Sequence, residues 1–250
     1  MGNDEMRETS DISQYVEKHG FGLFSPRAVL FDMDGVLYDS MPNHAVSWHD
    51  AMADYGLDMP YEGAYRYEGM RGVETIRLLA RRQWQRELSD DEAEQMYAHK
   101  SEAFVRCAAQ SPAAAMPGIR TLMQQVKSDG LKICVVTGSG QHALLDKLLT
   151  DFEGLLDASL IVTAFDVRHG KPNPEPYLMG LKKAGVDATE AIVVENAPLG
   201  IQAARSAGIF TLAVNTGPLP DSVLFDAGAN LVMPSMPYLT DHWEEIGSED

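Results

Sequence analysis

Two acidic residues directly after a short apolar run are the first in this chain whose types and spacing could do chemistry. Asp32 and Asp34 follow an Ala-Val-Leu-Phe run at residues 28–31, and Gly35 comes next. Such a run indicates a strand buried on both faces, and residues two apart on an extended chain share a side. Two carboxylates held together repel each other unless a cation or a shared proton lies between them. The pair therefore indicates a cation or proton site, the alternative being a polar turn that only ends the strand.

Three further apolar runs also lead into polar residues. These segments are Thr137-Gly138-Ser139-Gly140 after residues 131–136, Gly170-Lys171-Pro172-Asn173-Pro174 after residues 160–163, and Glu195-Asn196 after residues 191–194. A hydroxyl beside the N–H groups of a helix start can hold a phosphate oxygen, a stiff proline loop limits where its lysine points, and acid and amide oxygens suit Mg²⁺. Each segment alone could be a helix cap or an exposed side chain. Together they favour one ligand site, because ligands of open parallel sheets bind beyond the carboxyl ends of the strands.

The elements that would position these residues alternate between strands and helices from residue 131 onwards. This alternation predicts βαβ units and a parallel sheet, whereas about 70 residues after the first strand carry helical patterns. We therefore predict an α/β fold with a doubly wound parallel-sheet core at residues 27–40 and 113–250, interrupted by an inserted helical domain at residues 41–112. Residues 1–26 are an N-terminal extension with a short amphipathic helix. Hinges are expected near residues 39–42 and 111–118.

Two helices of the inserted domain have recognisable patterns. Asn43 is placed to cap the first helix, which is expected to run to about Tyr55. Farther along, one apolar stripe at helical spacing consists of Ala93, Met96, Tyr97 and Phe104.

The composition limits the kinds of partner. A net charge of −17 argues against unspecific binding to nucleic acid or anionic membranes, so an anionic substrate must meet local cations. No apolar run approaches the roughly 18 residues that span a bilayer, and the N-terminus lacks the apolar core of a secretory signal. Cys107 and Cys134 show no metal spacing, and a disulfide framework is not expected. We therefore expect a cytoplasmic protein with a small-molecule substrate and no nucleic-acid or membrane partner. The acidic surface is compatible with a monomer.

With its strand-end motifs taken together, the sequence resembles the haloacid dehalogenase (HAD) superfamily, and specifically the β-phosphoglucomutase-like branch with a helical cap after the first motif. The motifs Asp32-x-Asp34-Gly-Val, Thr137, Lys171 and Glu195-Asn196 occur in the superfamily order within about residues 27–235. The resemblance implies a Rossmann-like HAD core, phosphoryl-transfer chemistry and Mg²⁺ as the cofactor.

The resemblance also implies a role for each motif residue. Asp32 would be the nucleophile that becomes an aspartyl phosphate, and Asp34 would be the general acid and base. Thr137 would orient the phosphoryl oxygens, and Lys171 would offset the charge between nucleophile and phosphate. Since dehalogenating members lack the second aspartate, Asp34 favours phosphoryl transfer.

The implied Mg²⁺ ligands are the Asp32 carboxylate, the Asp34 backbone carbonyl and Asn196, with Glu195 alongside. The fourth motif of this branch usually reads Glu-Asp, so Asn196 removes one negative charge and should weaken Mg²⁺ binding. Beside the motifs, the residues expected to contact the substrate are Gly138, Ser139 and Asn173.

The inserted domain carries the segment Tyr67-Glu68-Gly69-Met70-Arg71-Gly72, which in this branch faces the active site. We interpret Glu68 as a replacement carboxylate that contacts the metal when the cap closes, and Arg71 as a substrate contact. Aligned on Gly69, the phosphate-binding arginine of mutase-like members falls at Gly72, one place beyond Arg71. An ordinary exposed turn is the alternative for both residues. A closed cap leaves little space for a sugar, and the combination resembles HAD members that hydrolyse inorganic pyrophosphate.

His44 lies in the stretch Asp39-Ser40-x-x-x-His44-x-x-x-Trp48, which matches the start of the cap in mutase-like relatives. There the histidine helps to gate closure and proton transfer; a surface histidine near a hinge is the alternative. Phosphonate-cleaving members use a cap lysine as Schiff-base former. Residues 41–99 contain no lysine, which argues against that branch.

These inferences predict a Mg²⁺-dependent phosphohydrolase that acts through phospho-Asp32 on a small phosphorylated metabolite, with inorganic pyrophosphate as the leading candidate. One alternative is a β-phosphoglucomutase-type enzyme that returns the phosphoryl group to a second sugar hydroxyl. The other alternative is a non-catalytic module that binds phosphometabolites.

Overall fold

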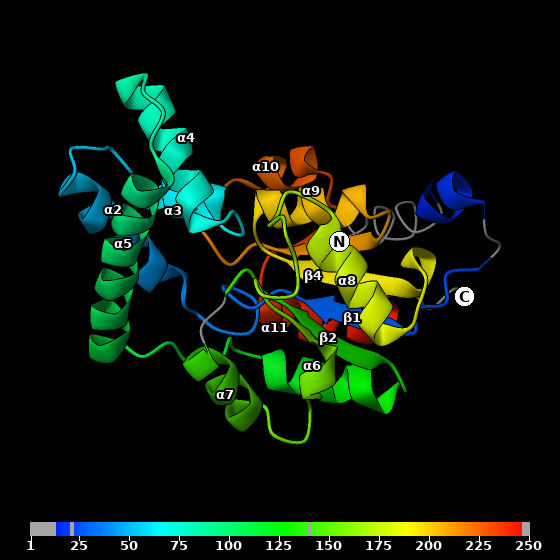
Figure 1. The fold of residues 1–250 in the computed structure, drawn as a ribbon. Helices are drawn as coiled ribbons and strands as arrows, with labels where there is room; N and C mark the ends of the chain where they lie inside the picture. Colours follow the sequence, from blue (N-terminus) through cyan, green and yellow to red (C-terminus); the bar gives the residue numbers. More distant parts are fainter. Residues whose placement is uncertain (1–13, 21–22, 140–141, 247–250) are drawn as a thin grey trace.

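The strand that carries Asp32 lies in the middle of a parallel sheet. The computed structural model describes residues 14–20, 23–139 and 142–246, and its six strands pair in the order β3-β2-β1-β4-β5-β6 (Figure 1). The strands are β1 (Ala28–Phe31), β2 (Lys132–Val136), β3 (Ile161–Val162), β4 (Ala191–Glu195), β5 (Phe210–Val214) and β6 (Leu231–Met233). All neighbouring strands are parallel. The predicted doubly wound α/β fold is confirmed, and the carboxyl ends of β1, β2 and β4 meet at one edge.

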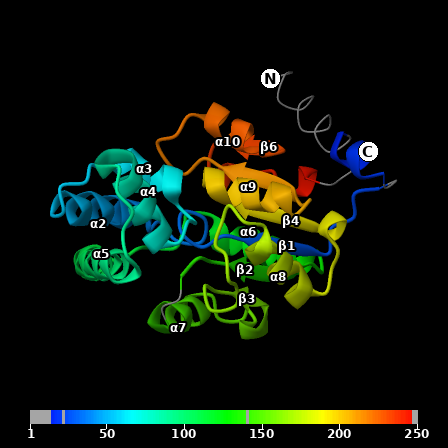
Figure 2. The same cartoon turned by 45° about the horizontal axis from the view of Figure 1, so that its top comes forward.

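Helices cover both faces of the sheet (Figures 1 and 2). One face packs against α6 (Ile119–Ser128), α7 (His142–Asp151) and α11 (Met236–Asp241), and the other against α8 (Glu175–Ala184), α9 (Pro198–Ser206) and α10 (Asp221–Ala227). Val29 and Phe31 point to the first face, Ala28 and Leu30 to the second. All four are fully buried, so burial on both faces explains why this run does not alternate with polar residues. Within the described part of the chain, short 3₁₀ turns at Ala158–Leu160, Ala188–Glu190 and Trp243–Glu245 complete the core.

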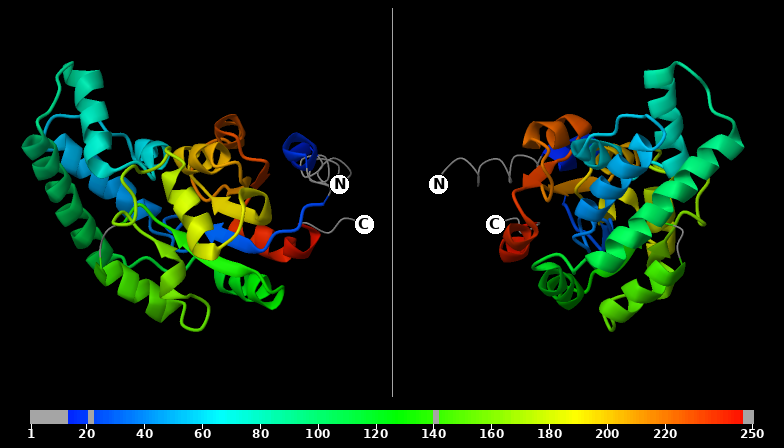
Figure 3. Two further views of the ribbon diagram at one scale, coloured as in Figure 1. Left: turned by 45° about the vertical axis from the view of Figure 1, so that its right-hand side comes forward. Right: turned by 90° about the vertical axis from the view of Figure 1, so that its left-hand side faces the viewer.

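The helices that directly follow β1 form a separate lobe, hereafter the cap (Figure 3). They are α2 (Met41–Ala53), α3 (Tyr61–Tyr67), α4 (Gly72–Trp84) and α5 (Asp90–Gln110), whereas α6, which comes next, belongs to the core. The cap has its own buried apolar cluster, which includes Trp48, Met52, Ile76, Leu79 and Met96. A lobe with its own core can move as a unit relative to the sheet.

The first cap helix begins earlier than the sequence pattern predicts. Ser40 is the N-cap residue of α2, and Pro42 lies in the first turn, where its missing N–H is not needed. Asn43 is therefore not the N-cap residue of α2. Its side chain donates to the carbonyl of Ser111, the residue that follows α5, at 2.8 Å.

Two chain segments that run side by side join the cap to the core. Tyr38 forms an antiparallel bridge with Ala115, and the Asp39 N–H donates to the Ala114 carbonyl at 2.9 Å. The outgoing and returning segments are thus held together as a two-stranded ribbon where the hinges are predicted.

The N-terminal extension contributes helical residues 14–19, which pack on the core. Tyr15 is buried there and donates to the Gly208 carbonyl at 2.9 Å. Ile12, which is part of the predicted helix, lies outside the described residues. Among the helices that the structure describes, none combines the length and apolar character needed to cross a bilayer.

Candidate active site

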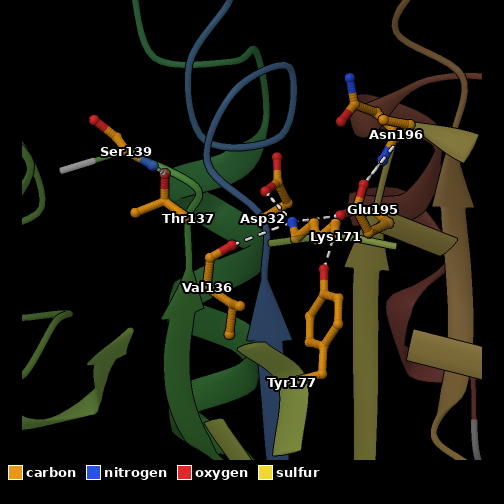
Figure 4. Close-up of polar contacts among 9 residues, drawn as sticks. Asp32, Val136, Thr137, Ser139, Lys171, Tyr177, Glu195 and Asn196 are labelled. Atoms are coloured by element: carbon orange, nitrogen blue, oxygen red, sulfur yellow. Dashed lines mark hydrogen bonds and ion pairs between the residues drawn. The ribbon is translucent and has the colours of Figure 1, made fainter. Parts of the chain in front are cut away.

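Lys171 connects the carboxyl ends of three neighbouring strands (Figure 4). Its Nζ donates to Asp32 Oδ1 at 2.5 Å, to Glu195 Oε1 at 2.6 Å and to the Val136 carbonyl at 3.3 Å. The lysine and both acids are almost completely buried. The predicted motif residues from β1, from β4 and from the loop before α8 therefore meet in one ion-pair cluster.

Glu195 holds this cluster in place, because each of its two carboxylate oxygens accepts two hydrogen bonds. Besides Lys171, Oε1 accepts a hydrogen bond from the Tyr177 hydroxyl at 2.8 Å. Oε2 accepts from the backbone N–H groups of Asn196 and Ala197 at 2.9 and 3.0 Å. Glu195 is thus oriented by the start of α9 and in turn orients Lys171 toward Asp32. Tyr177 in α8 is a contributor that the sequence patterns did not single out.

The loop between α3 and α4 brings a third carboxylate to this cluster. Oxygen atoms of Asp32, Glu68 and Glu195 all lie within 4.8 Å of one another. Burial, with repulsion from Glu195 and Asp34, outweighs the Lys171 charge and raises the pKa of Asp32 to about 7. Burial, followed by repulsion from Asp32 and Glu195, likewise raises the pKa of Glu68 well above its usual value. The site therefore has more negative charge than its own lysine balances.

The unpaired oxygens of this region fit a hard divalent cation. Among the described residues, the buried side-chain atoms without a hydrogen-bond partner include Asp32 Oδ2, Glu68 Oε2 and Asn196 Oδ1. Buried oxygens are rarely left unpaired, because the loss of water is not repaid. Two carboxylate oxygens and one amide oxygen are a donor set typical of Mg²⁺, which is held by few protein ligands and keeps several waters. The residues present therefore fit the expected cofactor.

Asp34 has a different set of neighbours. Its Oδ1 accepts a hydrogen bond from Ser40 Oγ at 2.5 Å and lies 3.5 Å from His44 Nε2. Burial alone raises the pKa of Asp34, but the charge of His44 and hydrogen bonds from His44 and Ser40 outweigh it and lower that pKa below its usual value. Burial and the Lys100 charge lower the pKa of His44. The pKa values of the two aspartates are thus shifted in opposite directions, and without a bound cation or substrate the order is the reverse of the one that an ionised nucleophile and a general acid need. A cation beside Asp32 would lower its pKa and favour the ionised form.

Lys100 of α5 completes this second group. Its Nζ lies 3.0 Å from His44 Nδ1 and over the rings of Trp48 and Phe104, at 5.0 and 4.9 Å from their centroids. Burial lowers its pKa to about 8. Lys100 lies one residue beyond the lysine-free stretch 41–99, so the absence of a lysine from that stretch does not mean that the cap offers none. The available signal was a lysine four residues after Met96, on the apolar side of a helix.

The remaining predicted residues do not all lie at the site. Thr137 is buried after β2, and its Oγ1 accepts a hydrogen bond from the Ser139 N–H at 3.0 Å. Asn173 is exposed, and its Oδ1 accepts from the Glu175 N–H at 2.9 Å as a cap of α8. The Arg71 guanidinium donates to the Arg168 carbonyl of the core at 3.3 Å. Neither Asn173 nor Arg71 lines the cavity beside Asp34.

That cavity lies between cap and core and is small, with a volume of about 90 Å³. Its walls include Asp34, Gly138 and Ser139 from the core and His44, Glu68 and Lys100 from the cap. Asp32 and Lys171 lie outside its lining, consistent with their burial. The structure thus shows the cap closed over the motif residues.

Glycines allow this close approach of cap and core. Gly69 has φ +84°, and a methyl group there would lie 2.9 Å from Lys171 Cδ. A methyl group at Gly170 would lie 2.9 Å from Arg71 Cγ and 3.4 Å from the Gly69 carbonyl oxygen. The α3–α4 loop therefore rests on the backbone of the core loop that carries Lys171.

Comparisons with known proteins agree on one family. A family model described as haloacid dehalogenase-like hydrolase matches residues 26–208. The chain is similar to a phosphorylated carbohydrates phosphatase of Thermotoga maritima, with 29% identity over 204 residues that cover 81% of this chain and 91% of that protein. It is similar to a fructose-1-phosphate phosphatase of Escherichia coli, with 30% identity over 184 residues that cover 72% and 92%. A solved structure of a candidate β-phosphoglucomutase from Bacteroides vulgatus has 48% identity and a TM-score of 0.91, covering 97% of this chain and 98% of that one.

Proposed function

We propose that this chain, which belongs to the haloacid dehalogenase-like hydrolase family, is a Mg²⁺-dependent phosphohydrolase acting through phospho-Asp32, with inorganic pyrophosphate as its substrate. The proteins similar to it include phosphatases and phosphoglucomutases. The choice of substrate rests on the small size of the closed site: the space left beside Asp34 is only about 90 Å³. Glu68 of the cap, which reaches the acidic cluster of the core, helps to close it.

The residues could perform the reaction in two displacement steps. An Asp32 oxygen attacks phosphorus, the bond from phosphorus to the leaving phosphate breaks, and the leaving oxygen takes a proton from Asp34. In the second step Asp34 removes a proton from water, the water oxygen bonds to phosphorus, and the bond to Asp32 breaks to release phosphate. Lys171, 2.5 Å from Asp32 Oδ1, reduces the repulsion that the nucleophile meets throughout.

Asp32, Glu68 and Asn196 would hold Mg²⁺, with the Asp34 backbone carbonyl as a further ligand. When bound, the metal offsets the charge of the nucleophile and the phosphate so that two anions can approach each other. The proton for the leaving group has a local source, because His44 lies between Asp34 and Lys100. An incoming phosphate adds negative charge beside this group, which raises the pKa of Asp34 and favours its acid form.

The size of the cavity supports a compact substrate. Pockets that hold drug-sized ligands usually measure roughly 300–1,000 Å³, several times the volume found here. With the cap closed, a phosphate group and a small leaving group suit the space better than a hexose.

A sugar phosphate is the second candidate substrate. The relatives from Thermotoga maritima and Escherichia coli are described as phosphatases of phosphorylated carbohydrates and of fructose 1-phosphate. A β-phosphoglucomutase-type activity would use the same aspartate pair and would depend on glucose 1,6-bisphosphate. A purely binding role is disfavoured, since Asp32, Asp34 and Lys171 are all present and assembled.

The deciding experiment measures phosphate release from pyrophosphate, fructose 1-phosphate, glucose 6-phosphate and β-glucose 1-phosphate, with Mg²⁺ and with EDTA. We expect the highest kcat/KM for pyrophosphate. We expect no phosphate release in the presence of EDTA, and none from the Asp32→Asn variant. Higher kcat/KM for a sugar phosphate would replace pyrophosphate by the second candidate. Unchanged turnover in Asp32→Asn would contradict the covalent mechanism.

The metal role of Glu68 has a test of its own. Glu68→Ala should need more Mg²⁺ for half-maximal activity and turn over pyrophosphate more slowly, whereas Asn196→Asp should need less Mg²⁺ because it restores a charge. If both variants keep the wild-type Mg²⁺ dependence and pyrophosphate kinetics, the assignment of Glu68 is wrong.

A further inference from the structure

We propose that the Tyr97 ring, which lies across Gly72, sets the upper size of the substrate by separating the catalytic cavity from a larger outer groove. The inference rests on the proposed phosphohydrolase function and deepens it, because it names the residue that would confine the site to compact phosphates.

Two neighbouring spaces lie along the junction of cap and core. The catalytic cavity measures about 90 Å³, and the groove outside it measures about 840 Å³. The groove is lined by Arg71, Val73, Glu94, Val105 and Arg106 among others. Four residues line both spaces, namely Gly72, Tyr97, Ser101 and Gly138. These four therefore form the partition.

The helical geometry of α5 explains why the partition lies where it does. Tyr97 and Ser101 are four residues apart and so lie one above the other on the helix. On one side of this line, Lys100 and Phe104 face the catalytic cavity. On the other side, Glu94 and Val105 face the groove. The Tyr97–Ser101 line is thus the boundary between a catalytic side and an outer side of one helix.

The contact with Gly72 closes the partition from the opposite helix. A methyl group at residue 72 would overlap Tyr97 Cε2 and Cδ2, so the ring rests directly on the backbone of the first residue of α4. Gly72 does not have the positive φ that would by itself require glycine. We infer that the space needed by the ring accounts for glycine at this position. Tyr97 is also 38% exposed, although the sequence pattern predicts it in the apolar stripe of the cap.

Removing or displacing this ring would join the cavity to the groove. The organic part of a phosphate ester could then pass over Gly72 while its phosphate stays beside Asp34. Arg71, Arg106 and Glu94 would offer polar contacts to hydroxyl groups there. The esters that would gain most are therefore phosphates of sugars and other polyols.

Two variants open the partition in independent ways. Tyr97→Ala removes the ring, and Gly72→Ala displaces it while keeping the tyrosine. Tyr97→Phe keeps the ring, and Tyr61→Ala removes an exposed tyrosine elsewhere in the cap. For each protein, kcat/KM is measured with pyrophosphate and with glucose 6-phosphate, and thermal unfolding confirms that the chain is folded.

We expect the ratio of kcat/KM for glucose 6-phosphate to that for pyrophosphate to rise at least tenfold in Tyr97→Ala and in Gly72→Ala. Tyr97→Phe and Tyr61→Ala should keep the wild-type ratio. An unchanged ratio in both opening variants, with pyrophosphate turnover retained, would overturn the role of Tyr97 and leave the proposed function intact. If the wild type does not hydrolyse pyrophosphate, but both opening variants gain tenfold in glucose 6-phosphate hydrolysis, the proposed substrate fails and the role of Tyr97 stands.

Discussion

Among single residues, Lys100 is expected to support catalysis but to lower the stability of the fold. Its ammonium is buried beside His44, and burial lowers its pKa to about 8 from an unfolded value near 10.4. At pH 7 the folded protein therefore keeps a buried positive charge, which lowers the free energy of unfolding by roughly 3 kcal/mol. Replacing Lys100 removes this cost but also removes its contacts with the rings of Trp48 and Phe104. We expect Lys100→Met to raise the free energy of unfolding by about 1–3 kcal/mol at pH 7 while it lowers kcat.

The pH dependence of that gain checks its cause. Between about pH 8 and pH 10.4 the folded wild type loses the Lys100 proton while the unfolded chain keeps it, so wild-type stability rises with pH across this range. The advantage of Lys100→Met in urea unfolding should therefore shrink from pH 7 to pH 10. An advantage that stays constant would show that the buried charge is not its origin.

Tyr177 allows a second test at this scale. Its hydroxyl is one of the donors to Glu195, which also receives Lys171 and two backbone N–H groups. Since a hydrogen bond to a charged group contributes about 1.5–3 kcal/mol, Tyr177→Phe should reduce the free energy of unfolding in urea by that amount. Tyr61→Phe, at an exposed position, should change it by less than about 0.5 kcal/mol. Equal effects of the two substitutions would contradict the role of Tyr177 in holding Glu195.

Sequence patterns located the residues at strand ends and missed those that only the cap brings in. Asp32, Lys171 and Glu195 could be predicted because each follows a buried apolar run in a parallel sheet. Lys100 and Tyr97 could not be assigned, because which side of α5 faces the core depends on how the cap closes. Asn173 lies two residues after Lys171 in the sequence, yet its side chain accepts a hydrogen bond at the start of α8 and does not line the cavity.

At the level of elements, the α3–α4 loop seats on the core through glycine contacts. In Gly170→Ala the new methyl group would lie 2.9 Å from Arg71 Cγ and 3.4 Å from the Gly69 carbonyl oxygen. We expect this substitution to favour the open cap, which raises KM and speeds amide hydrogen exchange in residues 67–72.

A matched variant and a compensating one test that reading. Gly138→Ala adds a methyl group that meets only the Gly69 carbonyl oxygen, at an ordinary 3.7 Å, and should leave the exchange of residues 67–72 at the wild-type rate. Adding Arg71→Ala to Gly170→Ala removes the side chain that the new methyl group would contact. Amide exchange in residues 67–72 should then slow again, part of the way to the wild-type rate. If the double variant exchanges as fast as Gly170→Ala, the contact with Arg71 is not the cause.

The strands were predictable to within a residue or two, because each is a short apolar run buried on both faces. The start of α2 was harder to predict, because Asn43 is as good an N-cap residue as Ser40 by residue type. The side chain of Ser40 is instead used by Asp34, a tertiary contact that no local pattern records.

At the scale of the whole molecule, the proposed metal site has ligands from both lobes. Asp32 and Asn196 belong to the core and Glu68 to the cap, so Mg²⁺ should stabilise the assembled molecule as any ligand of the folded state does. We expect Mg²⁺ to raise Tm by several degrees in the wild type and by less in Glu68→Ala. Glu62→Ala, which removes an exposed acid from the same helix region, should keep the wild-type shift. An identical shift in all three proteins would place the bound metal elsewhere.

The ribbon that joins the lobes has a consequence for how such a chain can diversify. Because Tyr38 and Ala115 are paired neighbours, the cap leaves and rejoins the core at almost the same point. A segment with adjoining ends can be exchanged as a cassette, by recombination or in the laboratory, without altering the register of the sheet. Transplanting the cap of a sugar phosphatase between these two junctions would leave Asp32 and Lys171 where they are. A new preference for substrate could thus be acquired in a single genetic step, with the core residues Asp32, Asp34 and Lys171 inherited unchanged.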